Sequence, residues 1–379
     1  MNLNKYFLAV ASVMMLAACT NENLPLEESE VTAPVYIPGD SEVEILLGSR
    51  GNNVTVKSKR AAFEGDADMD QLGVFCLARE KQHVNQAAQD IVWFTDDEEN
   101  WSGCIMNNVE AIKTGSTVTW ADATKHYYYP VSQFYCYDFF GYYPYSEDVT
   151  IADEKVMVNY ELDGKTEIIW GRATSDEDYA YSATYFRQEE NVGNYPTLDL
   201  HHVLTRLKFF VTPGAEVEGG TTVSPKLANF AVARIEVLDA ISNVQLTVAD
   251  KANINTLNEQ NCLTVGENRA DYVLCGFDGE PMDTTMVGTD LSVSTRLGES
   301  VLLAPESEYT IRVYLINKES GEKFVTEHPL KVNNASSTFL PGYTYNVNIT
   351  AHALEEIQLE AALNPWVDAD ESENPSIIL

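Results

Sequence analysis

The sequence is poor in positive charge and in long apolar runs. Of its 379 residues, 24 are Lys or Arg and 58 are Asp or Glu, which gives a formal net charge of −34 at pH 7. A surface this acidic repels phosphate backbones, so we expect no binding to nucleic acid. No apolar run reaches the roughly 18 residues that a membrane-spanning helix needs. We therefore expect no part of the chain to cross a membrane as a helix.

The chain also lacks the short motifs of common enzyme classes. It contains no G-x-S-x-G nucleophile elbow, no H-E-x-x-H zinc helix and no G-x-x-x-x-G-K-[ST] phosphate loop. Without such a motif, no catalytic residue and no cofactor can be assigned. We predict that the protein is not an enzyme.

Two patterns come near to a metal site. Residues 66–70 (Asp-Ala-Asp-Met-Asp) are spaced like the first ligands of a calcium loop, but Gln71 replaces the required glycine and Leu77 the required glutamate. The histidines at 201–202 are adjacent, and neighbours on a strand point to opposite faces. We predict no metal site.

Cysteine is rare in the sequence, with six residues in all. An odd number of these follows the N-terminal segment, so they cannot all pair within one exported chain. We interpret them as buried reduced thiols that pack as small hydrophobic groups, and a single Cys262–Cys275 disulfide is the alternative. The five are Cys76, Cys104, Cys136, Cys262 and Cys275.

Aromatic residues are abundant, with 20 Tyr and 14 Phe. They occur in short strand-like runs that Gly, Asn and Asp turns separate, a pattern that is typical of β-sandwiches. The clearest break in composition is the Gly- and Pro-rich stretch 213–225. We predict an all-β fold with an N-terminal sandwich at 61–213, a C-terminal sandwich at 214–367 and an acidic tail at 368–379.

The first 18 residues have the features of a bacterial lipoprotein signal peptide. Lys5 precedes an apolar stretch, and Leu16-Ala17-Ala18-Cys19 places a cysteine after two small residues. We predict cleavage between Ala18 and Cys19 and lipidation of Cys19, so that the protein is an outer-membrane lipoprotein that contacts the membrane through its lipid anchor alone. We interpret the polar, Pro-containing residues 19–40 as a tether between the lipid and the folded part of the protein.

Residues 41–60 combine a strand pattern with a basic stretch. Val43, Ile45 and Leu47 alternate with other residues, which favours a strand with one buried face. From Gly48 onward the pattern breaks, and the stretch to Arg60 holds four cations in an acidic protein: Arg50, Lys57, Lys59 and Arg60. We interpret this stretch as an exposed basic loop.

A dense aromatic cluster spans residues 127–145. Aromatic platforms bind sugars by stacking, but aromatic residues that alternate along adjacent strands also fill the core of a sandwich. We favour the core.

Several motifs, in this order, make the chain resemble the fimbrillin family of Mfa-like proteins, which are type V pilins of Bacteroidales. The resemblance covers about residues 40–367. After the lipoprotein signal, the motifs are Phe63-Glu64-Gly65-Asp66, Leu72-Gly73-Val74-Phe75, Phe139-Phe140-Gly141-Tyr142-Tyr143-Pro144, Leu200-His201-His202-Val203-Leu204-Thr205-Arg206-Leu207, Leu303-Ala304-Pro305, Phe339-Leu340-Pro341-Gly342-Tyr343-Thr344-Tyr345 and Asn364-Pro365-Trp366.

The resemblance implies two transthyretin-like β-sandwich domains, export as a palmitate-bearing lipoprotein and a place in a cell-surface fimbrium that serves adhesion. It further implies that an Arg-specific protease removes a propeptide, so that the strand with Val43, Ile45 and Leu47 is displaced and a strand of another pilin subunit replaces it. We expect cleavage at Arg60, and Arg50 is the alternative. A host or bacterial surface ligand is a further candidate partner.

Two questions remain open at the level of sequence. Residues 357–366 could be a donor strand or the last strand of the second sandwich, so that a stalk role and a tip or accessory role both fit the chain. The competing function is that of a monomeric surface lipoprotein whose β-sandwich domains bind glycans.

Overall fold

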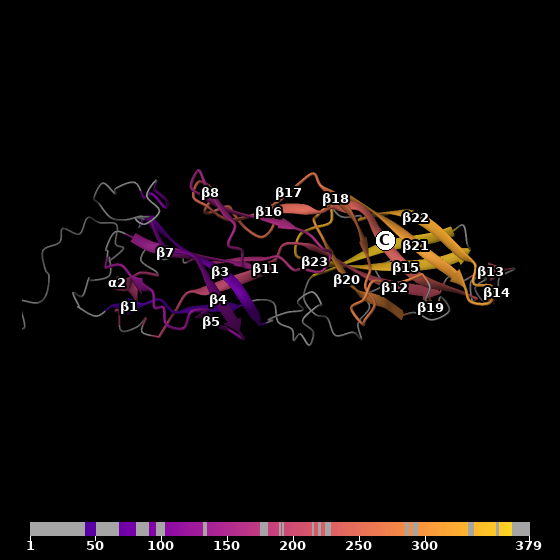
Figure 1. Ribbon diagram of the computed structural model, residues 1–379, viewed down its shortest axis with the longest axis horizontal. Coiled ribbons are helices and arrows are strands. Elements are labelled where there is room, and N and C mark those ends of the chain that lie inside the picture. Colours follow the sequence, from indigo (N-terminus) through magenta and orange to yellow (C-terminus); the bar gives the residue numbers. More distant parts are fainter. Residues whose placement is uncertain are drawn as a thin grey trace, which may run out of the picture. The chain divides into compact units, whose positions relative to one another are not determined.

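The computed structural model of the protein describes the greater part of the chain after residue 41. The described residues are 42–50, 68–80, 91–95, 103–131, 135–174, 181–188, 191, 193–213, 216–218, 221–223, 229–284, 288–290, 295–332, 337–353 and 356–365. Their regular secondary structure is almost entirely β-strand (Figure 1). The predicted all-β fold class is therefore confirmed.

Seven strands of the first half form a closed barrel. In hydrogen-bonding order they are β10 (Ile169–Ala173), β11 (Thr197–His202), β2 (Leu47–Arg50), β5 (Thr117–Trp120), β4 (Cys104–Thr114), β3 (Met69–Glu80) and β7 (Tyr135–Tyr143), and β7 pairs with β10. Within this barrel, β11 and β2 are parallel and the other neighbours are antiparallel. The short strand β2 thus completes the ring between β11 and β5.

The barrel interior explains most of the aromatic cluster. Strand β7 reads Tyr-Cys-Tyr-Asp-Phe-Phe-Gly-Tyr-Tyr, and its residues from Cys136 to Tyr142 are buried. Tyr129, in the short strand β6 (Tyr128–Tyr129), is also buried and lies near the rings of Tyr137 and Phe139. These rings form part of the hydrophobic core, as the favoured interpretation of the cluster predicts.

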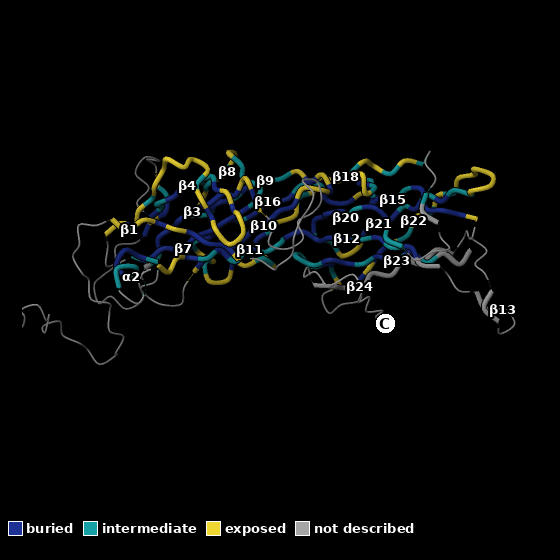
Figure 2. Tube along the Cα trace, turned by 90° about the horizontal axis from the view of Figure 1, so that it is seen from below, coloured by how far each residue is buried: buried dark blue, intermediate teal, exposed yellow. Residues whose placement is uncertain are grey.

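A second pair of sheets is built from later strands. One sheet has the order β20 (Thr295–Leu303), β12 (Thr205–Pro213), β23 (Tyr343–Ala353) and β24 (Glu356–Pro365). The other has the order β18 (Arg269–Val273), β15 (Phe230–Ile241), β21 (Glu308–Asn317) and β22 (Lys323–Lys331), and β19 (Thr289–Asp290) also pairs with β15. Buried residues alternate along β21 and contribute to the core, and Figure 2 shows such buried positions along the strands.

A further sheet joins the two halves of the sequence. It has the order β17 (Leu263–Val265), β16 (Asn243–Asp250), β9 (Lys155–Glu161) and β8 (Val149–Ala152). Close to it, the indole N–H of Trp170 donates to the carbonyl of Val248 at 2.9 Å. Strand β12 lies before the predicted domain boundary at 213 and pairs with β20 and β23. The division of the chain at that residue stays a prediction.

The remaining elements are short. They are the hairpin of β13 (Glu216–Glu218) and β14 (Thr221–Val223), the pair of β1 (Val43–Glu44) with β6, and the one-turn helix α2 (Ala183–Phe186). Ser182 caps α2, because its hydroxyl accepts a hydrogen bond from the Tyr185 N–H at 3.3 Å. Among the described residues, no helix has the length and apolarity needed to cross a membrane.

Candidate functional site: the segment that closes the barrel

The candidate site is the segment 43–50, which comprises β1 and β2 and which we call the closing segment. Its β2 part pairs with two strands that come much later in the chain: Gly48 lies opposite Thr197 of β11 and opposite Thr117 of β5. Its β1 part pairs Val43 with Tyr129 of β6. Without the closing segment, β11 and β5 would each have an unpaired edge, because no other described strand lies between them.

The closing segment holds its place partly through apolar burial. Ile45 is 0% exposed and Leu47 is 3% exposed, whereas Leu46 between them is 57% exposed. Val43 is half-buried and packs against the same core. Full burial of an aliphatic side chain contributes about 1.5–3 kcal/mol, so Ile45 and Leu47 together contribute about 3–6 kcal/mol.

Backbone hydrogen bonds fix the segment along its length. The N–H groups of Ile45, Gly48 and Ser49 donate to the carbonyls of Tyr127 at 2.8 Å, Pro196 at 2.8 Å and Ser116 at 3.0 Å, respectively. Any strand that replaced the closing segment would have to supply the same donors at the same spacing.

The strand continues past the predicted start of the loop. Gly48 and Ser49 are buried and Arg50 still belongs to β2, so the interpretation of residues 48–50 as an exposed loop is wrong. A glycine fits here beside the ring of Tyr195: a Cβ on residue 48 would lie 2.6 Å from Cε2 of that ring and 3.3 Å from the carbonyl oxygen of Ser116, so a larger residue would require the exposed ring to move.

A carboxylate–histidine contact and an ion pair flank the apolar part of the closing segment. At one end, the carboxylate of Glu44 lies 2.6 Å from Nδ1 of His126. At the other end, the Arg50 guanidinium donates to both carboxylate oxygens of Asp199, from Nε at 3.2 Å and from Nη2 at 3.1 Å. This hydrogen bonding raises the pKa of Arg50. His201 also faces Asp199, at 3.6 Å.

Sequence reasoning missed these partners of the closing segment. Glu44 is 82 positions from His126, and Arg50 is 149 positions from Asp199. The one available signal was the presence of one acid and one base at the two ends of an apolar strand, which does not identify what they face.

The structure places only part of the predicted site. Val43, Ile45, Leu47 and Arg50 all lie in the closing segment, as described above. Ala18, Cys19 and Arg60 lie outside the described residues. Displacement of the strand, lipidation and both cleavage sites stay predictions.

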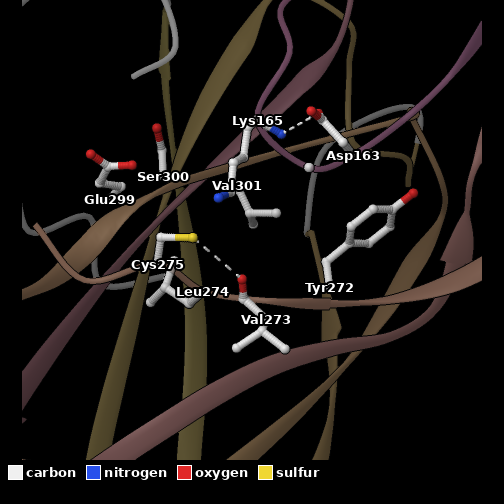
Figure 3. Close-up of a pocket in the computed structure, with 10 residues that line it drawn as sticks. Asp163, Lys165, Tyr272, Val273, Leu274, Cys275, Glu299, Ser300 and Val301 are labelled. Carbon is white, nitrogen blue, oxygen red and sulfur yellow. Dashed lines mark hydrogen bonds between the residues drawn. The ribbon is translucent and has the colours of Figure 1, made fainter. Parts of the chain in front are cut away.

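Other candidate sites offer little for a small ligand. A depression between the two halves of the sequence has room for about one water molecule (Figure 3). Asp163, which lies at its rim, accepts hydrogen bonds from the backbone N–H groups of Lys165 and Thr166 and so holds a local turn. In the part of the chain that the structure describes, no group of three His, Cys, Asp or Glu side chains could hold a metal ion.

The five described cysteines are all free, so the alternative Cys262–Cys275 disulfide does not form in this structure. Four are buried and Cys104 is partly buried. Burial raises the pKa of the Cys104 thiol to about 12, which leaves it protonated and unreactive at neutral pH.

The side chains of His201 and His202 contact different residues, as expected for neighbours on a strand. His201 faces Asp199, and His202 lies 3.4 Å from the buried Glu167.

The described residues thus define an all-β protein whose barrel is completed by its first described strands. The sequence profile of the fimbrillin-like family matches residues 60–366. The chain therefore belongs to the fimbrillin-like family. Among curated proteins, no sequence matches this chain significantly.

The solved structures that the chain matches include proteins from Bacteroides and Porphyromonas. A candidate cell adhesion protein from Bacteroides uniformis has a TM-score of 0.46 at 15% identity, covering 87% of this chain and 100% of its own. A fimbrial protein from Bacteroides vulgatus has a TM-score of 0.46 at 12% identity, with 86% and 99% covered. The tip fimbrial protein Mfa3 from Porphyromonas gingivalis, with C-terminal truncation, has a TM-score of 0.38 at 11% identity, with 86% and 100% covered.

Proposed function

We propose that this protein is a fimbrial subunit that serves cell adhesion and is assembled by donor-strand exchange. In this mechanism, Arg-specific proteolysis frees the closing segment, and a strand of another subunit takes its place. The observation that carries the proposal is the position of β2, a four-residue strand that alone connects β11 to β5 among the described strands. Its loss would expose two strand edges and the apolar surface under Ile45 and Leu47, which another strand could cover.

The structure favours a cleavage site beyond Arg50. A protease binds several residues around the scissile bond in extended form, which is costly where those residues are packed in a sheet. The three residues before Arg50 are buried in the barrel, and Arg50 itself is held by Asp199. Arg60 lies ten residues later, at the first residue of the family match. We therefore keep Arg60 as the proposed site.

Fimbriae isolated from cells that produce the protein provide the test of this proposal. We expect the chain to co-sediment with high-mass species that resist dissociation by detergent, and its N-terminal sequence to begin Ala-Ala-Phe-Glu at residue 61. Recovery of the chain only as an uncleaved monomer, separate from fimbriae, would contradict the proposal and favour a monomeric surface lipoprotein.

The same proposal includes export to the outer membrane with a lipid on Cys19. Substitution of Cys19 by Ala removes the acceptor of the acyl chains, each of which contributes about 0.8 kcal/mol per buried CH₂ to membrane binding. We expect Cys19→Ala to move the protein from the membrane pellet to the soluble fraction after cell fractionation. A variant that stays in the pellet would show that another part of the chain anchors it.

A further inference from the structure

The groove that the closing segment fills presents His126 at one end and the Asp199 carboxylate at the other, and it is crowded near the Asp199 end. We propose that it selects its donor strand by chemistry and accepts a strand from a different subunit, with a small residue at the position of Gly48 and a cation at that of Arg50, in preference to the C-terminal strand of a second copy of this chain. The inference rests on the proposed strand exchange and names the partner in it.

The first argument is the register that the contacts of Glu44 and Arg50 impose. Glu44 and Arg50 are six positions apart, which corresponds to about 20 Å along a strand. Between them, Ser49 is buried, and two apolar side chains point into the core, Ile45 and Leu47. A shift of the strand by one residue would turn these two outward, and a shift by two would separate Arg50 from Asp199. A matching donor therefore carries an acid, two buried apolar residues and a base in this order.

The second argument is the charge of the acceptor. Asp199 interacts with Arg50 through both of its carboxylate oxygens, and the protein as a whole has a net charge of −34. An uncharged residue opposite Asp199 would lose this pair, and an acidic one would add repulsion. Because the pair is exposed, it contributes to choice of partner and register more than to total affinity.

The third argument concerns the strand that a second copy could offer. Residues 332–379 contain neither Lys nor Arg. Residues 356–362 (Glu-Ile-Gln-Leu-Glu-Ala-Ala) match the closing segment best when Glu356 is aligned with Glu44, since Ile357 and Leu359 then replace Ile45 and Leu47. In this alignment Ala362 takes the place of Arg50, so Asp199 has no cation to bind.

The same alignment creates a steric conflict. Glu360 would take the place of Gly48, where a Cβ already comes within 2.6 Å of the Tyr195 ring. In addition, residues 356–365 already form β24 and pair with β23 along its length. A second copy would have to break that pairing before it could donate this strand.

The experiment measures strand exchange with synthetic peptides. The precursor carrying Cys19→Ala is cleaved with an Arg-specific protease, and fluorescent peptides of residues 41–50 and of residues 353–362 are added in turn. Fluorescence anisotropy reports incorporation. We expect the 41–50 peptide to exchange into the groove and the 353–362 peptide to bind at least about tenfold more weakly.

Charge reversal tests the role of Asp199 directly. An Arg50→Glu version of the 41–50 peptide should bind about tenfold more weakly at low salt, by a margin that shrinks as salt screens the charges. The acceptor variant Asp199→Lys should restore its binding. The matched control is Glu322→Lys, which makes the same change of charge in an exposed turn between β21 and β22 and should restore nothing.

The possible outcomes separate the two proposals. If no peptide exchanges into the cleaved protein, the proposed function fails and this inference with it. If the 41–50 peptide exchanges but the 353–362 peptide binds equally well, strand exchange stands and selection against a second copy is overturned. If Arg50→Glu has no effect, or Glu322→Lys rescues as well as Asp199→Lys, the role of Asp199 is overturned.

Discussion

A precursor with Arg60→Lys is expected to stay uncleaved and outside fimbriae, while Arg50→Lys is cleaved and incorporated like the parent. Lysine keeps the positive charge at either position but is not a substrate of an Arg-specific protease. Residues 47–50 form β2 within the barrel, which protects the bond after Arg50, so the expected difference follows from the location of the two arginines. N-terminal sequencing of the surface protein and its co-sedimentation with fimbriae measure the result.

The double variant Arg50→Ala, Arg60→Ala extends this experiment. It blocks both candidate sites and should leave a folded, soluble monomer with an intact closing segment. Loss of the exposed Arg50–Asp199 pair should lower the free energy of unfolding by no more than about 1 kcal/mol. Assembly of this double variant into fimbriae as efficiently as the parent would refute the proposal that cleavage in this region releases the strand.

Local patterns in the sequence predicted much of the fold. The short strand-like runs and the turns between them indicated an all-β chain, and the described residues do form strands from β1 to β24. The motif at residues 200–207 spans two strands: β11 ends at His202, β12 begins at Thr205, and the two belong to different sheets. Hydrophobic alternation does not reveal such a change of sheet, because Val203 and Leu204, which connect the two strands, are both 0% exposed.

Pairing between distant strands could not be predicted in the same way. Strand β16 pairs with β9, some 90 residues earlier, and β2 pairs with β11, about 150 residues later. Such partners depend on the packing of the whole chain rather than on local propensity. For the candidate site, the pattern of Val43, Ile45 and Leu47 predicted a strand. It could not show that the strand closes a barrel or that Gly48 and Ser49 extend it.

The last expected result concerns the two buried side chains of the closing segment. Leu47→Ala and Ile45→Ala should each lower the free energy of unfolding of the precursor by about 2–4 kcal/mol, because each removes a side chain that is at most 3% exposed. Leu46→Ala is the matched control, since Leu46 is 57% exposed and its truncation should cost less than about 0.5 kcal/mol. Chemical denaturation of the three uncleaved variants measures these differences.

Combining Ile45→Ala with Leu47→Ala removes most of the apolar contribution of the closing segment, a loss comparable with the 5–15 kcal/mol that stabilises a typical domain. We expect this double variant to release the segment without proteolysis, so that the uncleaved precursor takes up the labelled 41–50 peptide that the parent precursor excludes. The unlabelled 41–50 peptide in excess should suppress that uptake if both strands compete for the edges of β11 and β5. Equal destabilisation by Leu46→Ala and Leu47→Ala, or exclusion of the peptide by the double variant, would mean that burial of Ile45 and Leu47 does not keep the barrel closed.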